Sequence, residues 1–267
     1  FRGGHDLPFA DITPGLVESY ETYLRRQGLV PNTTSFYLRN LRAVYHRAVS
    51  EGLTEDRHPF RHVYTGVEKT AKRAISSRVI RRIKDLPLPP DSPLGQARDL
   101  FLFSFYTRGM AFVDLSRLRK QDLQGGMLSY RRRKTGQALS IRWEKPMREI
   151  VDRHACPGSP YLLPVIDTPG NGERRRYLNA LHTLNRHLKA IGRMAGCPIP
   201  LTSYCARHAW ASIARSERVP LATISEAMGH TSERTTRIYL ATLDTSAVDE
   251  ANRRVIRTVC GKYRTGV

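Results

Sequence analysis

Apolar positions recur along most of the chain with the three-to-four-residue spacing of amphipathic helices. Thr13-Pro14 places a capping residue before a proline at the first helical position, and Gly28 ends that segment. Pro31 opens a second segment, which Gly52 closes. Similar patterns follow at residues 76–86, 94–108, 177–195, 203–216, 219–228 and 246–259. The chain is therefore predicted to be mainly α-helical.

Residues 127–143 follow a different, alternating pattern. Apolar and polar residues alternate along the chain on both sides of Lys134-Thr135-Gly136. Alternation around a glycine-containing turn predicts a β-hairpin, with Lys134 at its turn. The expected fold class is mainly α with a small β-hairpin or sheet.

A domain boundary is predicted where apolar anchors become scarce and cations frequent, between residues 57 and 75. We expect a helical domain at 1–64, a basic linker at 65–75 and a second domain at 76–267. A basic linker can lie along DNA and let two lobes close around it. An ordinary surface loop fits the same composition equally well.

The charge balance points to a polyanionic partner. The 267 residues are 40% hydrophobic, enough for a core, and Lys and Arg outnumber Asp and Glu by 44 to 24, which gives a net charge of +20. The excess is spread along the chain. Nucleic acid is the default partner of such a protein, and a ribosome-bound or merely basic protein is the alternative.

Cysteine spacing and hydropathy exclude several other classes. The four cysteines (Cys156, Cys197, Cys205 and Cys260) include no C-x-x-C pair, which argues against a zinc site and a secreted disulfide framework and favours a reducing, cytoplasmic setting. No signal peptide, membrane-length apolar run, P-loop or carboxylate cluster is visible, so we expect no membrane contact, cofactor or metal. Because the chain begins at Phe1, we expect a fragment that lacks a further N-terminal module.

Candidate chemistry is concentrated between Leu201 and Leu240. Arg207-His208 opens one helical pattern, Gly229-His230 follows another, and Tyr239 lies nine positions beyond His230. A guanidinium binds two phosphate oxygens, an imidazole can bind a third, and a phenol can attack phosphorus. This grouping indicates chemistry on a phosphate.

In the order R-H-x-x-A, G-H-[ST]-S and Tyr, these residues resemble the C-terminal signature of the tyrosine recombinase (phage integrase) family. The resemblance implies a two-lobed DNA clamp, with a helical core-type DNA-binding domain at 1–64 and an α+β catalytic domain at 76–267. It implies that Tyr239 forms a 3′-phosphotyrosyl link and releases a 5′-hydroxyl, without metal or ATP. Arg207 would neutralise charge on the phosphate oxygens. His230 would donate to the phosphate or help to deprotonate Tyr239.

The hairpin residue Lys134 matches the family lysine that protonates the leaving 5′-oxygen. Its neighbours Arg131, Arg132 and Arg133 leave a second interpretation, in which the basic hairpin only binds backbone phosphates.

Two positions depart from the family pattern. Tyr204 stands where the family has histidine in H-x-x-R; its hydroxyl can donate to phosphate, but it cannot act as a near-neutral base. Ala111 occupies the slot of the first catalytic arginine, three residues after Arg108. Arg108 either reaches the same phosphate from a shifted position or caps helix-end carbonyls. Asp114 would orient one of the cations. This variant resembles a subgroup of integrases on bacterial mobile elements.

The leading hypothesis is thus a site-specific DNA recombinase of the bacterial cytoplasm. It would act as a homo-tetramer on two DNA duplexes at specific recombination sites, with accessory DNA-bending proteins as further partners. The helical pattern at 246–259 could dock in cis or on a neighbouring subunit. A type IB topoisomerase-like enzyme and a catalytically decayed DNA-binding accessory factor are the alternatives.

Overall fold

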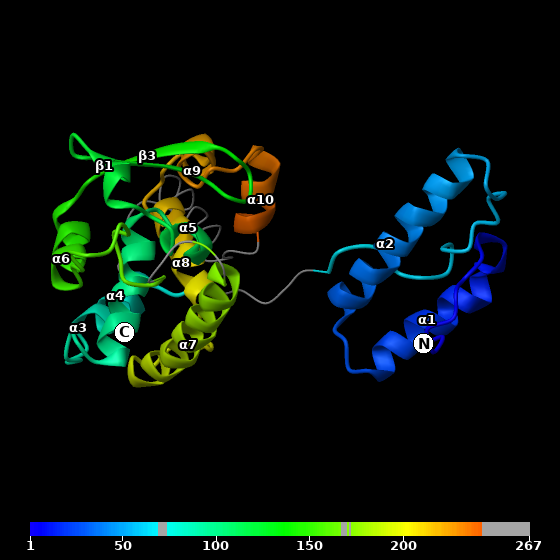
Figure 1. Cartoon of the computed structure of the whole chain (residues 1–267), viewed down its shortest axis with the longest axis horizontal. Helices are drawn as coiled ribbons and strands as arrows, with labels where there is room; N and C mark the ends of the chain where they lie inside the picture. Colours follow the sequence, from blue (N-terminus) through cyan, green and yellow to red (C-terminus); the bar gives the residue numbers. More distant parts are fainter. Residues whose placement is uncertain (69–73, 167–169, 171, 242–267) are drawn as a thin grey trace, which may run out of the picture. The chain divides into compact units, whose positions relative to one another are not determined.

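The computed structural model describes residues 1–68, 74–166, 170 and 172–241, apart from the side chains of Arg234, Ile238, Tyr239 and Ala241. The chain divides into two compact units, Phe1–Ala71 and Lys72–Val267 (Figure 1). The central part of the expected linker, 69–73, and the expected helix at 246–259 lie outside the described residues.

The N-terminal unit is built on two long helices that pack on each other. A short 3-10 turn, η1 (Phe9–Asp11), leads into α1 (Pro14–Arg26), and α2 (Pro31–Ser50) follows. The Thr13 hydroxyl accepts from the Leu16 amide at 3.3 Å, as the sequence pattern predicts for a helix cap. Apolar side chains from both helices and from the segment after α2 form its core: Ile12, Val17, Leu38, Tyr45, Phe60 and Val63.

Residues 65–68, where the linker was expected to begin, are hydrogen-bonded to α2. The Ser35 hydroxyl donates to the Gly66 carbonyl at 2.5 Å. The Asn32 side chain donates to the Glu68 carbonyl at 3.0 Å and accepts from the Glu68 amide at 2.8 Å. These four residues are thus part of the N-terminal unit.

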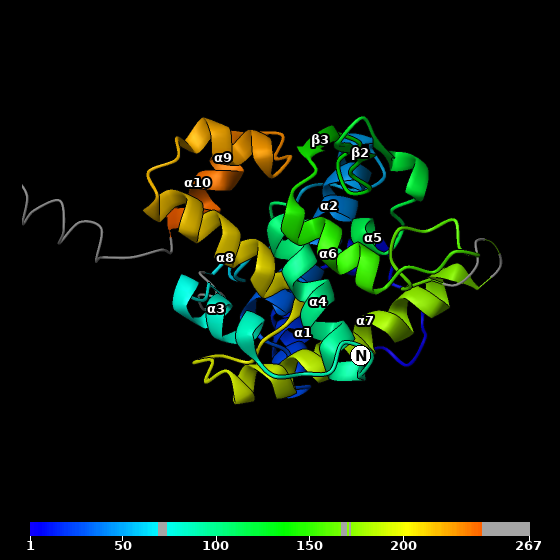
Figure 2. The same ribbon diagram turned by 90° about the vertical axis from the view of Figure 1, so that its left-hand side faces the viewer.

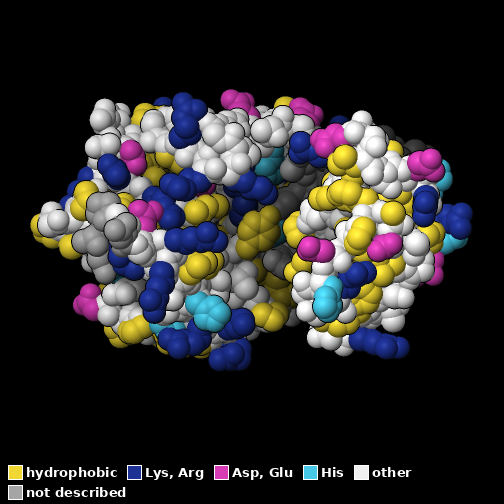
Figure 3. Space-filling model, turned by 45° about the vertical axis from the view of Figure 1, so that its right-hand side comes forward, with side chains coloured by type: hydrophobic (Ala, Val, Ile, Leu, Met, Phe, Trp, Pro, Cys, Tyr) yellow, Lys and Arg dark blue, Asp and Glu magenta, His cyan; other side chains and the backbone are white. Residues whose placement is uncertain are grey.

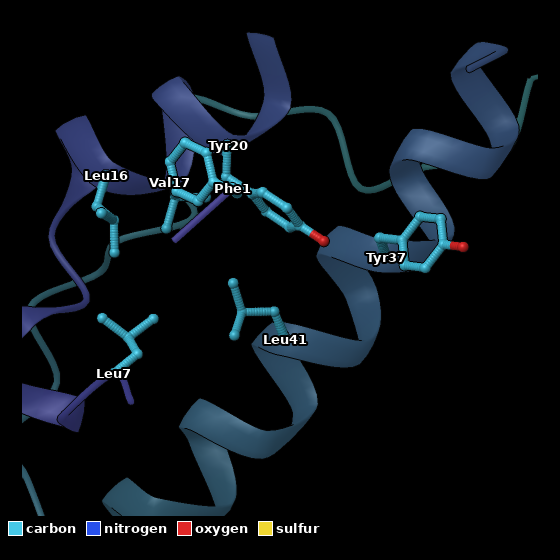
Figure 4. A pocket seen from close by; sticks show the side chains of 7 residues that line it. All are labelled: Phe1, Leu7, Leu16, Val17, Tyr20, Tyr37 and Leu41. Carbon is cyan, nitrogen blue, oxygen red and sulfur yellow. The ribbon is translucent and has the colours of Figure 1, made fainter. Parts of the chain in front are cut away.

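An apolar pocket opens between α1 and α2 (Figure 4). Aliphatic and aromatic side chains line it: Phe1, Leu7, Leu16, Val17, Tyr20, Tyr37 and Leu41. None of these seven side chains carries a charge.

The C-terminal unit is organised around α4 (Pro93–Tyr106), which contacts helices α3, α6, α7 and α8. Phe101 and Phe103 of α4 are fully buried there beside Leu188 of α7. The other helices of this unit are α3 (Ser77–Asp85), α5 (Phe112–Leu115), η2 (Lys120–Asp122), α6 (Lys145–Arg153), α7 (Glu173–Met194), α8 (Ser203–Ser216), α9 (Leu221–Ala227) and α10 (Glu233–Ala241).

A small antiparallel sheet with strand order β1-β2-β3 completes the unit. In the hairpin of β2 (Met127–Arg131) and β3 (Ala138–Arg142), Met127 pairs with Arg142 and Arg131 with Ala138. The prediction of a mainly helical protein with a hairpin around Lys134 is therefore confirmed. Strand β1 (Leu123–Gln124) and helix α6 were not predicted.

The last three described helices form a separate small cluster. Helix α9 contacts both α8 and α10 (Figures 1 and 2). Small and aliphatic residues fill the space between them: Ala211, Ala214, Ile224, Met228 and Leu240. The turn from α9 to α10, which carries Gly229 and His230, is held against α8 in this way. None of the described helices is long and apolar enough to cross a membrane.

Candidate active site

Arg207 lies at the centre of the candidate site, on the inner face of α8, with only 5% of its surface exposed. Its Nη1 donates to the Gly109 carbonyl at 3.0 Å and its Nη2 to the Met228 carbonyl at 2.6 Å. Carbonyl oxygens satisfy buried N–H groups without neutralising the charge. In this structure the guanidinium is therefore held by two backbone carbonyls and keeps its positive charge.

The turn after α4 brings Arg108 and Gly109 close to Arg207. Gly109 has φ +72°, and a Cβ atom there would lie 2.5 Å from the Arg207 Cα atom. Only glycine permits this approach of the two backbones. Arg108 is itself left-handed, with φ +61°, so the two-residue turn reverses the chain beside Arg207.

His230 joins Arg207 to helix α10. Its Nε2 lies 3.0 Å from Arg207 Nη2, and its Nδ1 lies 2.6 Å from the Thr236 hydroxyl. A guanidinium can only donate, so Nε2 accepts and Nδ1 carries the proton. Burial lowers the pKa of His230 to about 4, and nearby positive charges act in the same direction: Arg207, Arg132 and Lys134. The imidazole is therefore neutral at pH 7 and able to accept a proton.

Arg132, which the sequence analysis did not single out, belongs to the same site. It follows strand β2, is 7% exposed, and its Nη1 donates to the Gly229 carbonyl. A run of three arginines reads as an exposed basic hairpin. Burial alternates along this strand, with Leu128 buried and Met127 and Ser129 exposed, and extending that alternation would have placed Arg132 on the inner face.

The buried Asp114 anchors the same hairpin. Its Oδ1 accepts from the Arg133 amide at 2.9 Å. Burial raises the pKa of the Asp114 carboxyl, and this hydrogen bond and the charges of Arg132 and Arg207 oppose the rise. Asp114 therefore fixes the hairpin backbone next to Lys134.

Lys134 and Arg108 contribute positive charge at the edge of the site. Lys134 is exposed at the hairpin turn, and its charge acts on His230. Arg108 is half-buried, and its charge acts on Tyr130, whose pKa burial raises to about 12. Among the described residues, the Arg108 guanidinium has no hydrogen-bond or ion-pair partner, including the helix-end carbonyls considered in the alternative interpretation.

Two further predicted residues belong to α8 and α10. Tyr204, 44% exposed in the first turn of α8, packs edge-on against His208 with ring centroids 4.7 Å apart. Tyr239 belongs to α10, but its side chain lies outside the described atoms. Its helix is nevertheless anchored at the site, because Thr236 contacts His230 and Leu240 is buried against α8 and α9.

Positive charge surrounds His230, since Arg207, Arg132 and Lys134 all act on it. Lys and Arg side chains are also frequent on the face of the C-terminal unit that Figure 3 shows. Within the described ranges, no group of three or more His, Cys, Asp or Glu side chains is placed to hold a metal ion. The chemistry available from these residues is phosphate binding, proton transfer and nucleophilic attack by a phenol.

Comparison with known proteins identifies the class. Residues 1–63 match the phage integrase SAM-like domain, and residues 96–246, more than half of the chain, match the phage integrase family. The chain belongs to the phage integrase family. Its activity is that of a tyrosine-type site-specific recombinase, and neither the topoisomerase-like nor the decayed-factor alternative is favoured.

Individual relatives agree with this assignment. The chain is 28% identical over 222 residues to tyrosine recombinase XerA of Pyrococcus furiosus, covering 81% of this chain and 72% of the relative. Its fold is similar to that of a lambda integrase (75–356) dimer bound to a COC′ core site, with a TM-score of 0.66 and 16% sequence identity; the match covers 92% of this chain and 84% of the lambda integrase chain. The fold is also similar to that of the Tn1549 transposon integrase bound to transposon right-end DNA, with a TM-score of 0.68 and 15% identity; this match covers 97% of this chain and 89% of the Tn1549 chain.

Proposed function

We propose that Tyr239 is the nucleophile of the recombination reaction. Its phenol oxygen attacks the scissile phosphorus, the bond to the 5′-oxygen breaks, and a 3′-phosphotyrosyl link forms. The energy of the broken ester is kept in the new one, so rejoining needs neither ATP nor metal. One observation carries the proposal: α10, the helix of Tyr239, is tied by Thr236 to the half-buried His230, which contacts the buried Arg207.

Arg207 and Arg132 are the proposed phosphate clamp. Both guanidiniums are buried and held by carbonyl oxygens, so their charge can stabilise the oxygens of a pentacoordinate phosphorus. In this chain Arg132 performs the phosphate-binding role of the first catalytic arginine, whose position in the family pattern is occupied by Ala111. Arg108, whose guanidinium has no acceptor among the described residues, would bind the same phosphate.

Proton transfer is assigned to His230 and Lys134. When the phosphate arrives, the Arg207 guanidinium turns its Nη2 towards a phosphate oxygen, and Nε2 of His230 becomes able to accept the Tyr239 proton. Lys134 donates a proton to the leaving 5′-oxygen, without which an alkoxide would have to depart. The exposed Tyr204 hydroxyl donates to a non-bridging oxygen.

The proposed substrate is double-stranded DNA at specific recombination sites. The net charge of +20 and the basic face support it. We further propose a clamp made of a helical DNA-binding domain and a catalytic domain at 76–267, which correspond to the two compact units. The expected basic linker, 65–75, is reduced at its start, because residues 65–68 are bonded to the N-terminal unit. The fold is similar to a lambda integrase tetramer bound to a Holliday junction, with TM-score 0.63, and we propose a homo-tetramer on two duplexes.

The proposed setting is a reducing, bacterial cytoplasm, which the free thiols of Cys156, Cys197 and Cys205 suit. Accessory DNA-bending proteins would help to assemble the proposed tetramer.

A covalent trapping experiment tests this function. A library of nicked duplexes, in which the cleaved strand diffuses away, is incubated with the wild-type chain and with Tyr239→Phe. The wild type should form a protease-sensitive protein–DNA adduct that maps to one site, and Tyr239→Phe should bind DNA but form none. An adduct that persists in Tyr239→Phe would refute the assignment. Strand transfer between two labelled copies of the mapped site then separates recombination from simple relaxation of supercoils.

A further inference from the structure

The imidazole of His230 is held at both nitrogens, and the second contact comes from the nucleophile helix. Nε2 faces Arg207, whereas Nδ1 lies 2.6 Å from the hydroxyl of Thr236, a residue with 0% exposed surface. Thr236 stands three positions before Tyr239, on the same helix. The contact therefore links proton acceptor and nucleophile within one turn of α10.

Hydrogen-bond chemistry determines which form of the ring fits here. Arg207 Nη2 is a donor, so a proton on Nε2 would oppose it. Only the ring with its proton on Nδ1 satisfies both contacts, donating to the Thr236 oxygen and accepting at Nε2. Without an acceptor at Nδ1, a proton on that nitrogen would lack a hydrogen-bond partner, so the ring can populate its other tautomer in spite of Arg207. In that form Nε2 is protonated and cannot accept the proton of a phenol.

We propose that Thr236 is a positioning residue for strand cleavage: its hydroxyl fixes His230 with the proton on Nδ1, so that the lone pair of Nε2 is available to the Tyr239 hydroxyl. The inference rests on the function proposed above for His230 and Tyr239. Burial of the hydroxyl supports it, because a buried hydroxyl without this partner would cost free energy that a methyl group of the same size would not.

Two substitutions of Thr236 separate the effect of its hydroxyl from that of its shape, and the neighbouring Thr235 provides a control. Thr236→Val keeps the shape and removes the hydroxyl, and Thr236→Ser keeps the hydroxyl and removes a methyl group. Thr235→Val makes the same change one residue earlier, on an exposed side chain of α10. Single-turnover adduct formation on the mapped nicked duplex should slow by about 10- to 100-fold in Thr236→Val, a loss similar to that caused by removing the hydrogen-bond partner that orients a metal-bound histidine. Thr236→Ser should recover most of that rate, and Thr235→Val should match the wild type, all at unchanged DNA affinity.

A second measurement reads the imidazole itself and does not depend on activity. In ¹⁵N NMR spectra of the selectively labelled wild-type chain at pH 7, His230 should carry its proton on Nδ1, and in Thr236→Val the Nε2–H form should appear. A wild-type ring protonated on Nε2 would overturn the proposal even if Thr236→Val failed to fold. So would wild-type cleavage by Thr236→Val, or a Thr236→Ser rate as low as that of Thr236→Val. Absence of any Tyr239-dependent adduct from the wild type would refute the proposed function instead.

Discussion

At the level of residues, the site gathers cations and leaves their charge largely uncompensated. The guanidiniums of Arg207 and Arg132 bind backbone carbonyls of Gly109, Met228 and Gly229. One buried carboxylate, Asp114, lies near them, and its Oδ1 accepts from a backbone amide. A site with this excess of positive charge is suited to a phosphodiester, whose negative charge on the non-bridging oxygens increases in the transition state.

Arg132→Ala should therefore lower the rate of strand cleavage by about 100- to 1,000-fold, the typical loss when one buried donor to a developing oxyanion is removed. The substitution also frees the hairpin from Gly229, so Arg132→Lys, which keeps a charge near the phosphate, should retain more activity. Single-turnover adduct formation at saturating DNA gives the rate.

Two arginines of the same region act as controls for that prediction. Arg133 is exposed, and Arg133→Ala keeps the backbone amide that binds Asp114, so its cleavage rate should stay close to that of the wild type. Arg108→Ala should fall between the two, since Arg108 is only half-buried. If Arg108→Ala abolished cleavage and Arg132→Ala did not, the shifted arginine predicted from the sequence would be the principal one.

At the level of elements, the site depends on close approach of backbones from distant parts of the chain. The end of α4 meets α8 at Gly109, and the hairpin meets the α9–α10 turn at Gly229. Both glycines have positive φ, and both would bring an added Cβ atom within 3.0 Å of another residue. These contacts, rather than the helices alone, set the positions of the charged side chains.

Gly109→Ala should destabilise the chain by about 3–5 kcal/mol, because the new Cβ would overlap the Arg207 backbone and the left-handed conformation adds strain. Gly136→Ala provides the control: Gly136 has a similar φ of +69°, but nothing lies within 4 Å of its Cβ position. That variant should lose only about 1 kcal/mol. Urea unfolding measures both, and equal losses would show that strain, not the α4–α8 contact, accounts for the effect.

Local signals in the sequence were sufficient for most of the elements but not for the assembled site. Caps, prolines and apolar spacing predicted α1, α2, α4 and α8, and the alternation around Lys134 predicted the hairpin. Helix α6 was missed because it is short and buries only Met147 and Ile150. The importance of Arg132 could not be inferred from its neighbours in the chain, because its partner Gly229 is 97 residues away.

At the level of the whole molecule, the residues of the candidate active site belong to the C-terminal unit and none belongs to the N-terminal unit. The described hydrogen bonds of Arg207, His230, Arg132 and Thr236 are all made within the C-terminal unit. The N-terminal unit has its own apolar core around Leu38, whereas the main core of the C-terminal unit includes Leu188. Two cores of this kind are expected to unfold as two cooperative units.

The tryptophans allow these two transitions to be told apart. Both of them, Trp143 and Trp210, belong to the C-terminal unit, so their fluorescence follows that unit, whereas far-ultraviolet circular dichroism follows the helices of both. Leu38 and Leu188 are each 0% exposed. Replacing either by alanine should cost about 2–5 kcal/mol through lost burial and a residual cavity. In urea, Leu38→Ala should shift part of the circular dichroism transition and leave the fluorescence midpoint in place, and Leu188→Ala should lower the fluorescence midpoint. A fluorescence midpoint that fell equally in both variants would mean that the units unfold as one.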